Sequence, residues 1–156
     1  GNRVISKCIF GGNYIGEPSA VMFRKADVRS PFREDMPQLS DMEMWFQLLE
    51  EGDLLNLSEP LCVFRSHPAQ MTHINVKQGL LVDDNIKLFE SYSNKSYLEM
   101  AWFSVWKYKL LMTYRIWLSR GSMPKVKRDM VLGKYASPVI YRLMPLMDLF
   151  VGIKKY

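Results

Sequence analysis

The sequence is poor in the residue types from which disulfide scaffolds and metal centres are built. It holds 2 cysteines and 2 histidines among 156 residues. Cys8 and Cys62 form no CxxC or other metal-ligand spacing, and we expect two reduced thiols in a cytoplasmic protein. His67 and His73 lie six residues apart across an expected loop. That is not a recognised ligand spacing, so a histidine metal pair is disfavoured.

Other absences exclude further classes of protein. No run is both apolar and uncharged for the length of a membrane span, and no fixed repeat occurs. Gly11-Gly12 indicates a turn and not a glycine-rich phosphate loop. A hydrophobic fraction of 48% and a charged fraction of 24% are those of a globular chain. The chain begins without methionine or a signal-peptide pattern, and we expect it to start within a longer gene product.

Charge is distributed unevenly. Residues 1–94 contain 9 Lys and Arg against 13 Asp and Glu, a net charge of −4, whereas residues 95–156 contain 12 against 3, a net charge of +9. The division indicates two surfaces with different partners, the basic one facing phosphate in some form. The alternative is a solvated basic face without a partner.

The hydrophobic pattern predicts an α+β fold. Residues 1–75 carry three short apolar runs that are typical of strands, at 20–24, 54–57 and 61–65, and one helix. Residues 76–156 form a mostly helical, basic tail. Its helices are expected at 76–92, 96–119, 124–133 and 137–154.

The helix predicted at 41–51 has the strongest pattern of the front part. Met42, Trp45, Phe46 and Leu49 follow the i, i+3, i+4, i+7 spacing of a buried stripe. Ser40 is a favourable N-cap, and Ser40-x-x-Glu43 is a capping box. Gly52 and Asp53 are expected to end the helix.

Two acids stand at the start of this helix. Asp41 and Glu43 are two positions apart, which separates them by roughly 200° of rotation, so they cannot both face one cleft. The capping box accounts for Glu43. Asp41 suits a general base at the mouth of a helix, although a helix-start acid also gains from the helix dipole alone.

Four segments together resemble the second half of family 2 glycosyltransferases with the GT-A fold. The likeness covers roughly residues 11–73. The segments are Asn13-x-Ile15-Gly16-x-Pro18-Ser19-Ala20-Val21-Met22-Phe23-Arg24, Pro31-Phe32-Arg33-Glu34, Asp41-x-Glu43-x-Trp45-x-x-Leu48 and Glu59-Pro60-Leu61-x-x-Phe64-Arg65-x-His67. Each is weak alone, but their order and spacing together are fairly specific.

The resemblance implies transfer of a sugar from a nucleotide-sugar donor to a hydroxyl of a glycan or lipid-linked acceptor, with inversion. Asp41 matches the aspartate that serves as general base. The resemblance further implies substrate-binding roles for Trp45, for Ser19 on the acceptor side, and for Arg65 and His67 near the donor diphosphate. The sequence departs from the family at Ser40, where Glu is frequent, and at Gln47, where Arg is common.

The resemblance also implies parts that the chain does not carry. No D-x-D motif occurs, so the nucleotide and a divalent metal, Mg or Mn, are expected to bind mainly outside this chain. The chain alone is expected to be inactive, and to associate through an exposed sheet edge. The Gln-x-x-Arg-Trp motif of processive polysaccharide synthases is absent, which favours addition of a single sugar.

The basic tail is rich in aromatic residues. Between residues 97 and 118 stand Tyr97, Trp102, Phe103, Trp106, Tyr108, Tyr114 and Trp117, interrupted by Lys107, Lys109 and Arg115. These charges disfavour a spanning helix. These residues are buried in a helical bundle in one interpretation and contact the cytoplasmic face of an anionic membrane in the other. Residues 139–156 continue the same apolar and basic pattern as far as Lys154 and Lys155. Single-stranded nucleic acid and a non-catalytic interaction module are lower-ranked alternatives.

Overall fold

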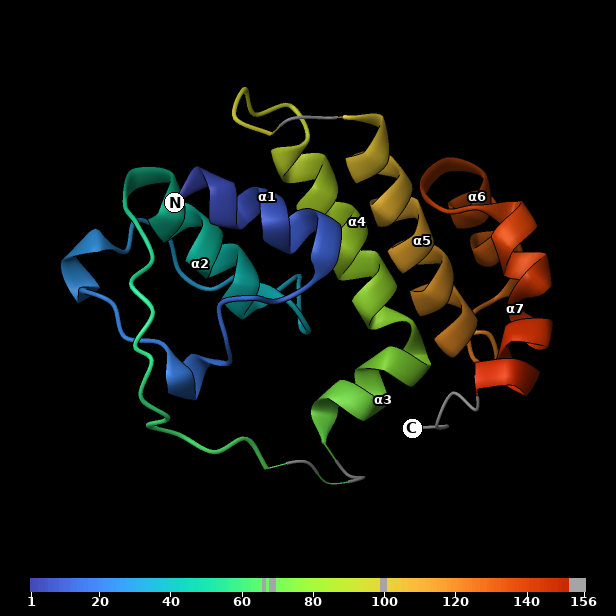
Figure 1. Cartoon of the computed structure of the whole chain (residues 1–156), viewed down its shortest axis with the longest axis horizontal. Coiled ribbons are helices and arrows are strands. Elements are labelled where there is room, and N and C mark those ends of the chain that lie inside the picture. The colour runs from blue at the N-terminus through green and yellow to red at the C-terminus, as the bar shows by residue number, and fades with distance from the viewer. Residues whose placement is uncertain (66, 68–69, 99–100, 152–156) are drawn as a thin grey trace.

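The structure is a computed structural model that describes residues 1–65, 67, 70–98 and 101–151, with the backbone alone at 147–151. All secondary structure of the described residues is helical (Figure 1). The α-helices are α1 (Asn2–Gly11), α2 (Ser40–Glu51), α3 (Met71–Gln78), α4 (Leu80–Tyr92), α5 (Trp102–Leu118), α6 (Lys125–Tyr135) and α7 (Pro138–Val151). Two short 3-10 turns, η1 (Pro18–Ala20) and η2 (Lys25–Asp27), lie between α1 and α2.

Helix α5 lies at the centre of the bundle. Helices α1, α3, α4, α6 and α7 all pack against it, and α1 also contacts α2. Figure 1 shows α1 and α2 on one side of α4 and α5, with α6 and α7 on the other. Met112 and Ile116 of α5 are fully buried, and the ring of Tyr108 stacks on Phe89 of α4 with centroids 4.2 Å apart. Among the described residues, no helix is both apolar enough and long enough to cross a bilayer.

The predicted α+β fold is wrong, because none of the three expected strands forms among the described residues. Val21 has extended backbone angles, φ −117° and ψ 132°. However, no neighbouring strand is present in the described chain to accept or donate the ladder hydrogen bonds that a strand requires. Most apolar side chains of these segments are therefore exposed to solvent; Met22 and Val63 are 98% and 96% exposed. The described residues hold no sheet edge through which the chain could associate, and association of the chain as such stays a prediction.

The predicted helices agree with the structure more closely than the predicted strands do. The helix expected at 41–51 is confirmed as α2, and it ends before Gly52. The helix expected at 76–92 is two helices, because Gly79 adopts a left-handed φ of 78° between α3 and α4. Helix α5 begins six residues after its expected start, and α6 and α7 each begin one residue after theirs. Helix α1 was not predicted, and the boundary expected at residues 75–76 falls inside α3.

The start of α2 is held by a buried carboxylate from another helix. The predicted capping box is wrong, since Leu39 is the N-cap and no side-chain cap bond forms. Instead Asp84 of α4, 1% exposed, accepts hydrogen bonds on Oδ2 from the backbone N–H groups of Gln38 (2.7 Å) and Leu39 (3.1 Å). A negative charge there also complements the helix dipole. Burial raises the pKa of Asp84, and these two hydrogen bonds partly offset that rise.

We predict that Asp84→Ala lowers the free energy of unfolding by about 1–3 kcal/mol, because it leaves the partly buried N–H of Gln38 and the buried N–H of Leu39 without an acceptor. Asp84→Asn should cost less, since the amide oxygen still accepts. Urea unfolding of both variants measures the difference. Equal stability of the alanine variant and the wild type would contradict this account.

Candidate active site around Asp41

The loop before α2 is shaped by one asparagine side chain. Asn13 Oδ1 accepts hydrogen bonds from the backbone N–H groups of Ile15 (2.9 Å) and Gly16 (3.0 Å), and its amide donates to the Gly16 carbonyl (3.3 Å). Gly16 has a φ of 127°, which lies in a region that disfavours any residue with a Cβ. The turn fixes the direction in which the chain continues to Glu17.

Trp45 connects this loop to α2 through a hydrogen bond. Its indole is 2% exposed and donates a hydrogen bond from Nε1 to the Gly16 carbonyl, at 3.3 Å. The rings of Phe23 and Phe32 pack against it, with centroids 5.4 and 6.4 Å away. All of these contacts are with the chain itself. In this arrangement Trp45, predicted to bind substrate, positions the loop beside the start of α2.

The fastened loop brings Glu17 close to Asp41. Asp41 is half-buried and accepts a hydrogen bond on Oδ1 from the N–H of Met42, at 2.7 Å. Burial raises the pKa of Asp41, and hydrogen bonds from the backbone N–H groups of Met42 and of Asp41 itself oppose that rise. The pKa of Glu17 is raised first by burial and then by the negative charge of Asp41. Burial is thus the first cause of both raised pKa values, and the negative charge of Asp41 adds to the rise at Glu17.

Glu43 faces a different environment, as the helical rotation predicts. It is 6% exposed, and its Oε2 accepts a hydrogen bond from Gln47 Nε2 at 2.7 Å. Its negative charge contributes to the raised pKa of Tyr92 on α4, after burial of that phenol. Asp41 and Glu43 thus do not share a cleft.

The remaining predicted site residues are exposed. Ser19 lies in η1, two positions after Glu17. Arg65 and His67 lie on the segment before α3, where Gln70 donates hydrogen bonds to both backbone carbonyls, at 2.8 and 3.1 Å. No described contact joins either side chain to Asp41. Their predicted roles toward a donor diphosphate stay predictions.

Metal-ligating side chains are scattered in the described part of the chain. No three His, Cys, Asp or Glu side chains there gather closely enough to hold a metal ion. The Asp41–Glu17 pair supplies two carboxylates but no third ligand.

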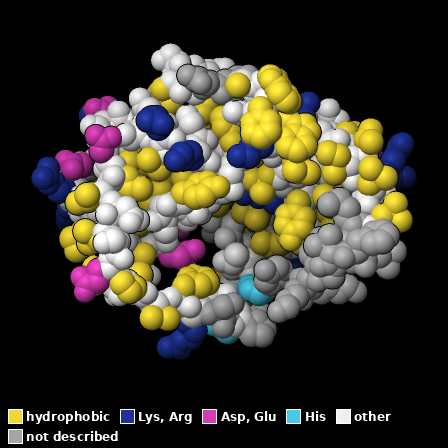
Figure 2. Space-filling view, in the orientation of Figure 1, with side chains coloured by type: hydrophobic (Ala, Val, Ile, Leu, Met, Phe, Trp, Pro, Cys, Tyr) yellow, Lys and Arg dark blue, Asp and Glu magenta, His cyan; other side chains and the backbone are white. Residues whose placement is uncertain are grey.

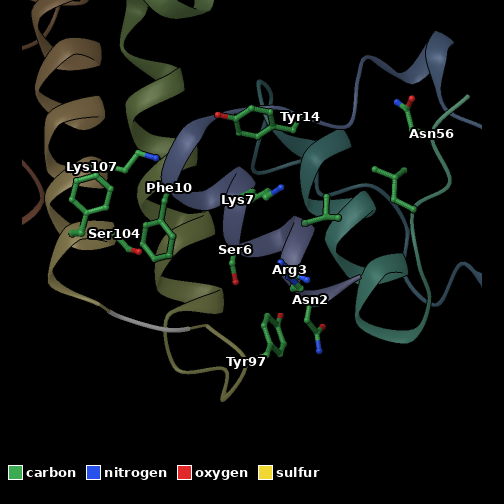
Figure 3. Close-up of a pocket in the computed structure, with 13 residues that line it drawn as sticks. Asn2, Arg3, Ser6, Lys7, Phe10, Tyr14, Asn56, Tyr97, Ser104 and Lys107 are labelled. Atoms are coloured by element: carbon green, nitrogen blue, oxygen red, sulfur yellow. The ribbon is translucent and has the colours of Figure 1, made fainter. Parts of the chain in front are cut away.

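A separate groove of about 1030 Å³ runs between α1, the start of α5 and the segment after α2 (Figure 3). Asp41 does not line it. Figure 3 shows Arg3, Ser6 and Lys7 on α1, with Ser104 and Lys107 across the groove on α5. Its lining is Asn2, Arg3, Val4, Ser6, Lys7, Phe10, Tyr14, Leu54, Asn56, Tyr97, Phe103, Ser104 and Lys107.

The aromatic residues of the tail separate into buried and exposed groups. Tyr108 is 3% exposed and belongs to the core, and the Arg115 guanidinium bonds to the Asn85 side chain. Burial lowers the pKa of Arg115 to about 10. Trp102, with 80% of its surface exposed, heads an aromatic cluster at the start of α5. Lys154 and Lys155 lie outside the described residues.

Comparison of the chain with protein families, with curated proteins and with solved structures finds no match. The geometry around Asp41 and the resemblance of its flanking segments therefore carry the functional argument.

Glu17 was missed by sequence reasoning. It occupies an unassigned position between Gly16 and Pro18 in the first resembling segment. Its place beside Asp41 depends on the Asn13 turn and on the Trp45 hydrogen bond, which join residues 29 positions apart. An acid between Gly and Pro in a loop was the only local signal.

We predict that Asp41→Asn lowers the pKa of Glu17, because it removes the neighbouring negative charge, while burial still holds that pKa above its usual value. NMR titration of the carboxyl carbons measures the change. Asp35→Asn is the matched control, since Asp35 is exposed and paired with Arg33 (2.8 Å) and Lys87 (3.2 Å). An unchanged Glu17 titration in Asp41→Asn would disprove the pairing.

Proposed function

We propose that this chain is the acceptor-side portion of a nucleotide-sugar-dependent glycosyltransferase, with Asp41 as general base. The observation that carries the proposal is the half-buried Asp41 carboxylate at the start of α2, with a raised pKa and a second acid beside it. It lies at the position where the resembling segments carry the family's catalytic aspartate. A catalytic carboxylate is expected in such a place, since partial desolvation tunes its basicity.

The reaction requires one proton transfer from this chain. As an acceptor hydroxyl attacks the anomeric carbon of the donor, its proton passes to Asp41, and the nucleoside diphosphate leaves from the opposite face. A base is more effective when its pKa is closer to that of the reacting group, so the raised pKa of Asp41 favours the step. Burial is the cause that raises the pKa of Asp41, while the charge of Asp41 in turn raises the pKa of Glu17.

The other predicted substrate-binding residues carry side chains that suit the same reaction. Ser19 is exposed close to Glu17 in sequence and suits a hydroxyl-rich acceptor. Arg65 and His67 are exposed and carry the groups that bind a diphosphate. A divalent metal, Mg or Mn, would neutralise the donor diphosphate, held mainly by other parts of the gene product. Absence of the processive motif supports addition of one sugar at a time.

We expect Asp41→Asn in the full gene product that contains this chain to lower the transfer rate by about 10²–10⁴-fold, the usual contribution of a general base. Donor affinity, measured by calorimetry, should stay near the wild-type value. Asp129→Asn is the matched control, because Asp129 is exposed on α6, outside the site.

The two readouts separate the ways in which this proposal can fail. If Asp41→Asn still transfers sugar, Asp41 is not the general base, although the gene product can still be a glycosyltransferase. A full gene product that binds no nucleotide sugar would overturn the class itself.

A further inference from the structure

Three cations gather at the groove between α1 and α5. Arg3 and Lys7 project from one face of α1, and Lys107 projects from α5 across the groove (Figure 3). Together with three aromatic residues of α5 they form what we call the basic–aromatic surface. Its members are Arg3, Lys7, Trp102, Phe103, Trp106 and Lys107.

The cations of this surface are not neutralised by the described chain. The residues that line the groove include no Asp or Glu, and no described carboxylate lies within salt-bridge distance of Arg3, Lys7 or Lys107. Two other lysines, by contrast, have carboxylate partners: Lys95 Nζ lies 2.8 Å from Glu50, and Lys127 Nζ lies 2.7 Å from Asp83. Within the described part of the chain, the surface therefore presents positive charge without a paired carboxylate, which favours an anionic partner.

The aromatic members are exposed beside these charges. Trp102, Phe103 and Trp106 are 80%, 51% and 48% exposed. The Phe103 and Trp106 rings stack with centroids 6.0 Å apart, and Lys107 Nζ lies 5.6 Å from the centre of the Phe103 ring. Indole and phenyl groups next to lysine and arginine are the side chains that favour the boundary between lipid headgroups and acyl chains.

The part of the molecule over α1 and the start of α5 shows few acidic side chains in Figure 2. Figure 2 shows hydrophobic and basic side chains together over α1 and the start of α5. The acidic side chains visible in that view lie toward the left edge and in the central hollow. The region over α1 and the start of α5 can thus contact an anionic surface while the visible acids lie to one side of that contact.

We propose that the basic–aromatic surface binds the surface of an anionic lipid bilayer, with Trp102, Phe103 and Trp106 entering the headgroup region and Arg3, Lys7 and Lys107 contacting lipid phosphates. This inference is independent of the proposed enzymatic function. A free phosphate ion would use the cations but leave the aromatic cluster in water. A bilayer uses both features at once, which is why it is favoured.

The test is co-sedimentation of the full chain with vesicles of phosphatidylglycerol and phosphatidylcholine, compared with phosphatidylcholine alone. Binding should require the anionic lipid and weaken as salt rises. Each neutralised cation should weaken partitioning about five-fold, so the triple variant Arg3→Gln/Lys7→Gln/Lys107→Gln should lose on the order of 100-fold. Trp102→Ala/Trp106→Ala should also weaken binding, while circular dichroism confirms that each variant is folded.

The matched control is Lys25→Gln/Lys77→Gln/Arg142→Gln, which removes the same charge from exposed positions on η2, α3 and α7. It should keep binding near wild type. Equal loss in the control would overturn the proposal, because net charge alone would then explain binding. Binding of inorganic phosphate or of single-stranded oligonucleotides through Arg3, Lys7 and Lys107, without vesicle binding, would also overturn it.

Discussion

The structure depends on the buried carboxylate of Asp84, which accepts two backbone N–H groups immediately before α2. Helix α2 has no cap from its own sequence, so a residue of α4 supplies the missing acceptor. The Gln38 side chain extends the link by accepting a hydrogen bond from Asn75 of α3, at 2.8 Å. Because α3 and α4 pack against α5, this network ties α2 to the centre of the bundle.

The Asp84 contact has consequences for the site. With the first turn of α2 fixed, Asp41 keeps one orientation, and Trp45 one turn later meets the Gly16 carbonyl. That contact in turn places Glu17 beside Asp41. The two carboxylates thus come from separate segments that the Trp45 hydrogen bond joins. The basic–aromatic surface forms on another part of the molecule, where α1 meets α5.

The spacing of apolar residues along the chain correctly predicted features that depend on contacts between residues a few positions apart. The stripe of Met42, Trp45, Phe46 and Leu49 is sufficient for a helix, and all four side chains are buried as expected. Asp41 could be singled out from its position at a helix start and from the resembling segments. The pattern Ile5, Cys8, Ile9 also carries helical spacing, and could have revealed α1. These successes concern contacts within a few residues.

The failures concern partners that are distant in sequence. Strand-like runs such as 61–65 need a neighbouring strand, and their composition cannot supply one. Ser40 and Glu43 satisfy the capping-box pattern, but Asp84 offers a buried acceptor that the pattern cannot foresee. Amide hydrogen exchange at Gln38 and Leu39 tests this most directly. Both amides are expected to exchange slowly in the native chain and rapidly in Asp84→Ala; rapid exchange in the native chain would contradict the role of Asp84.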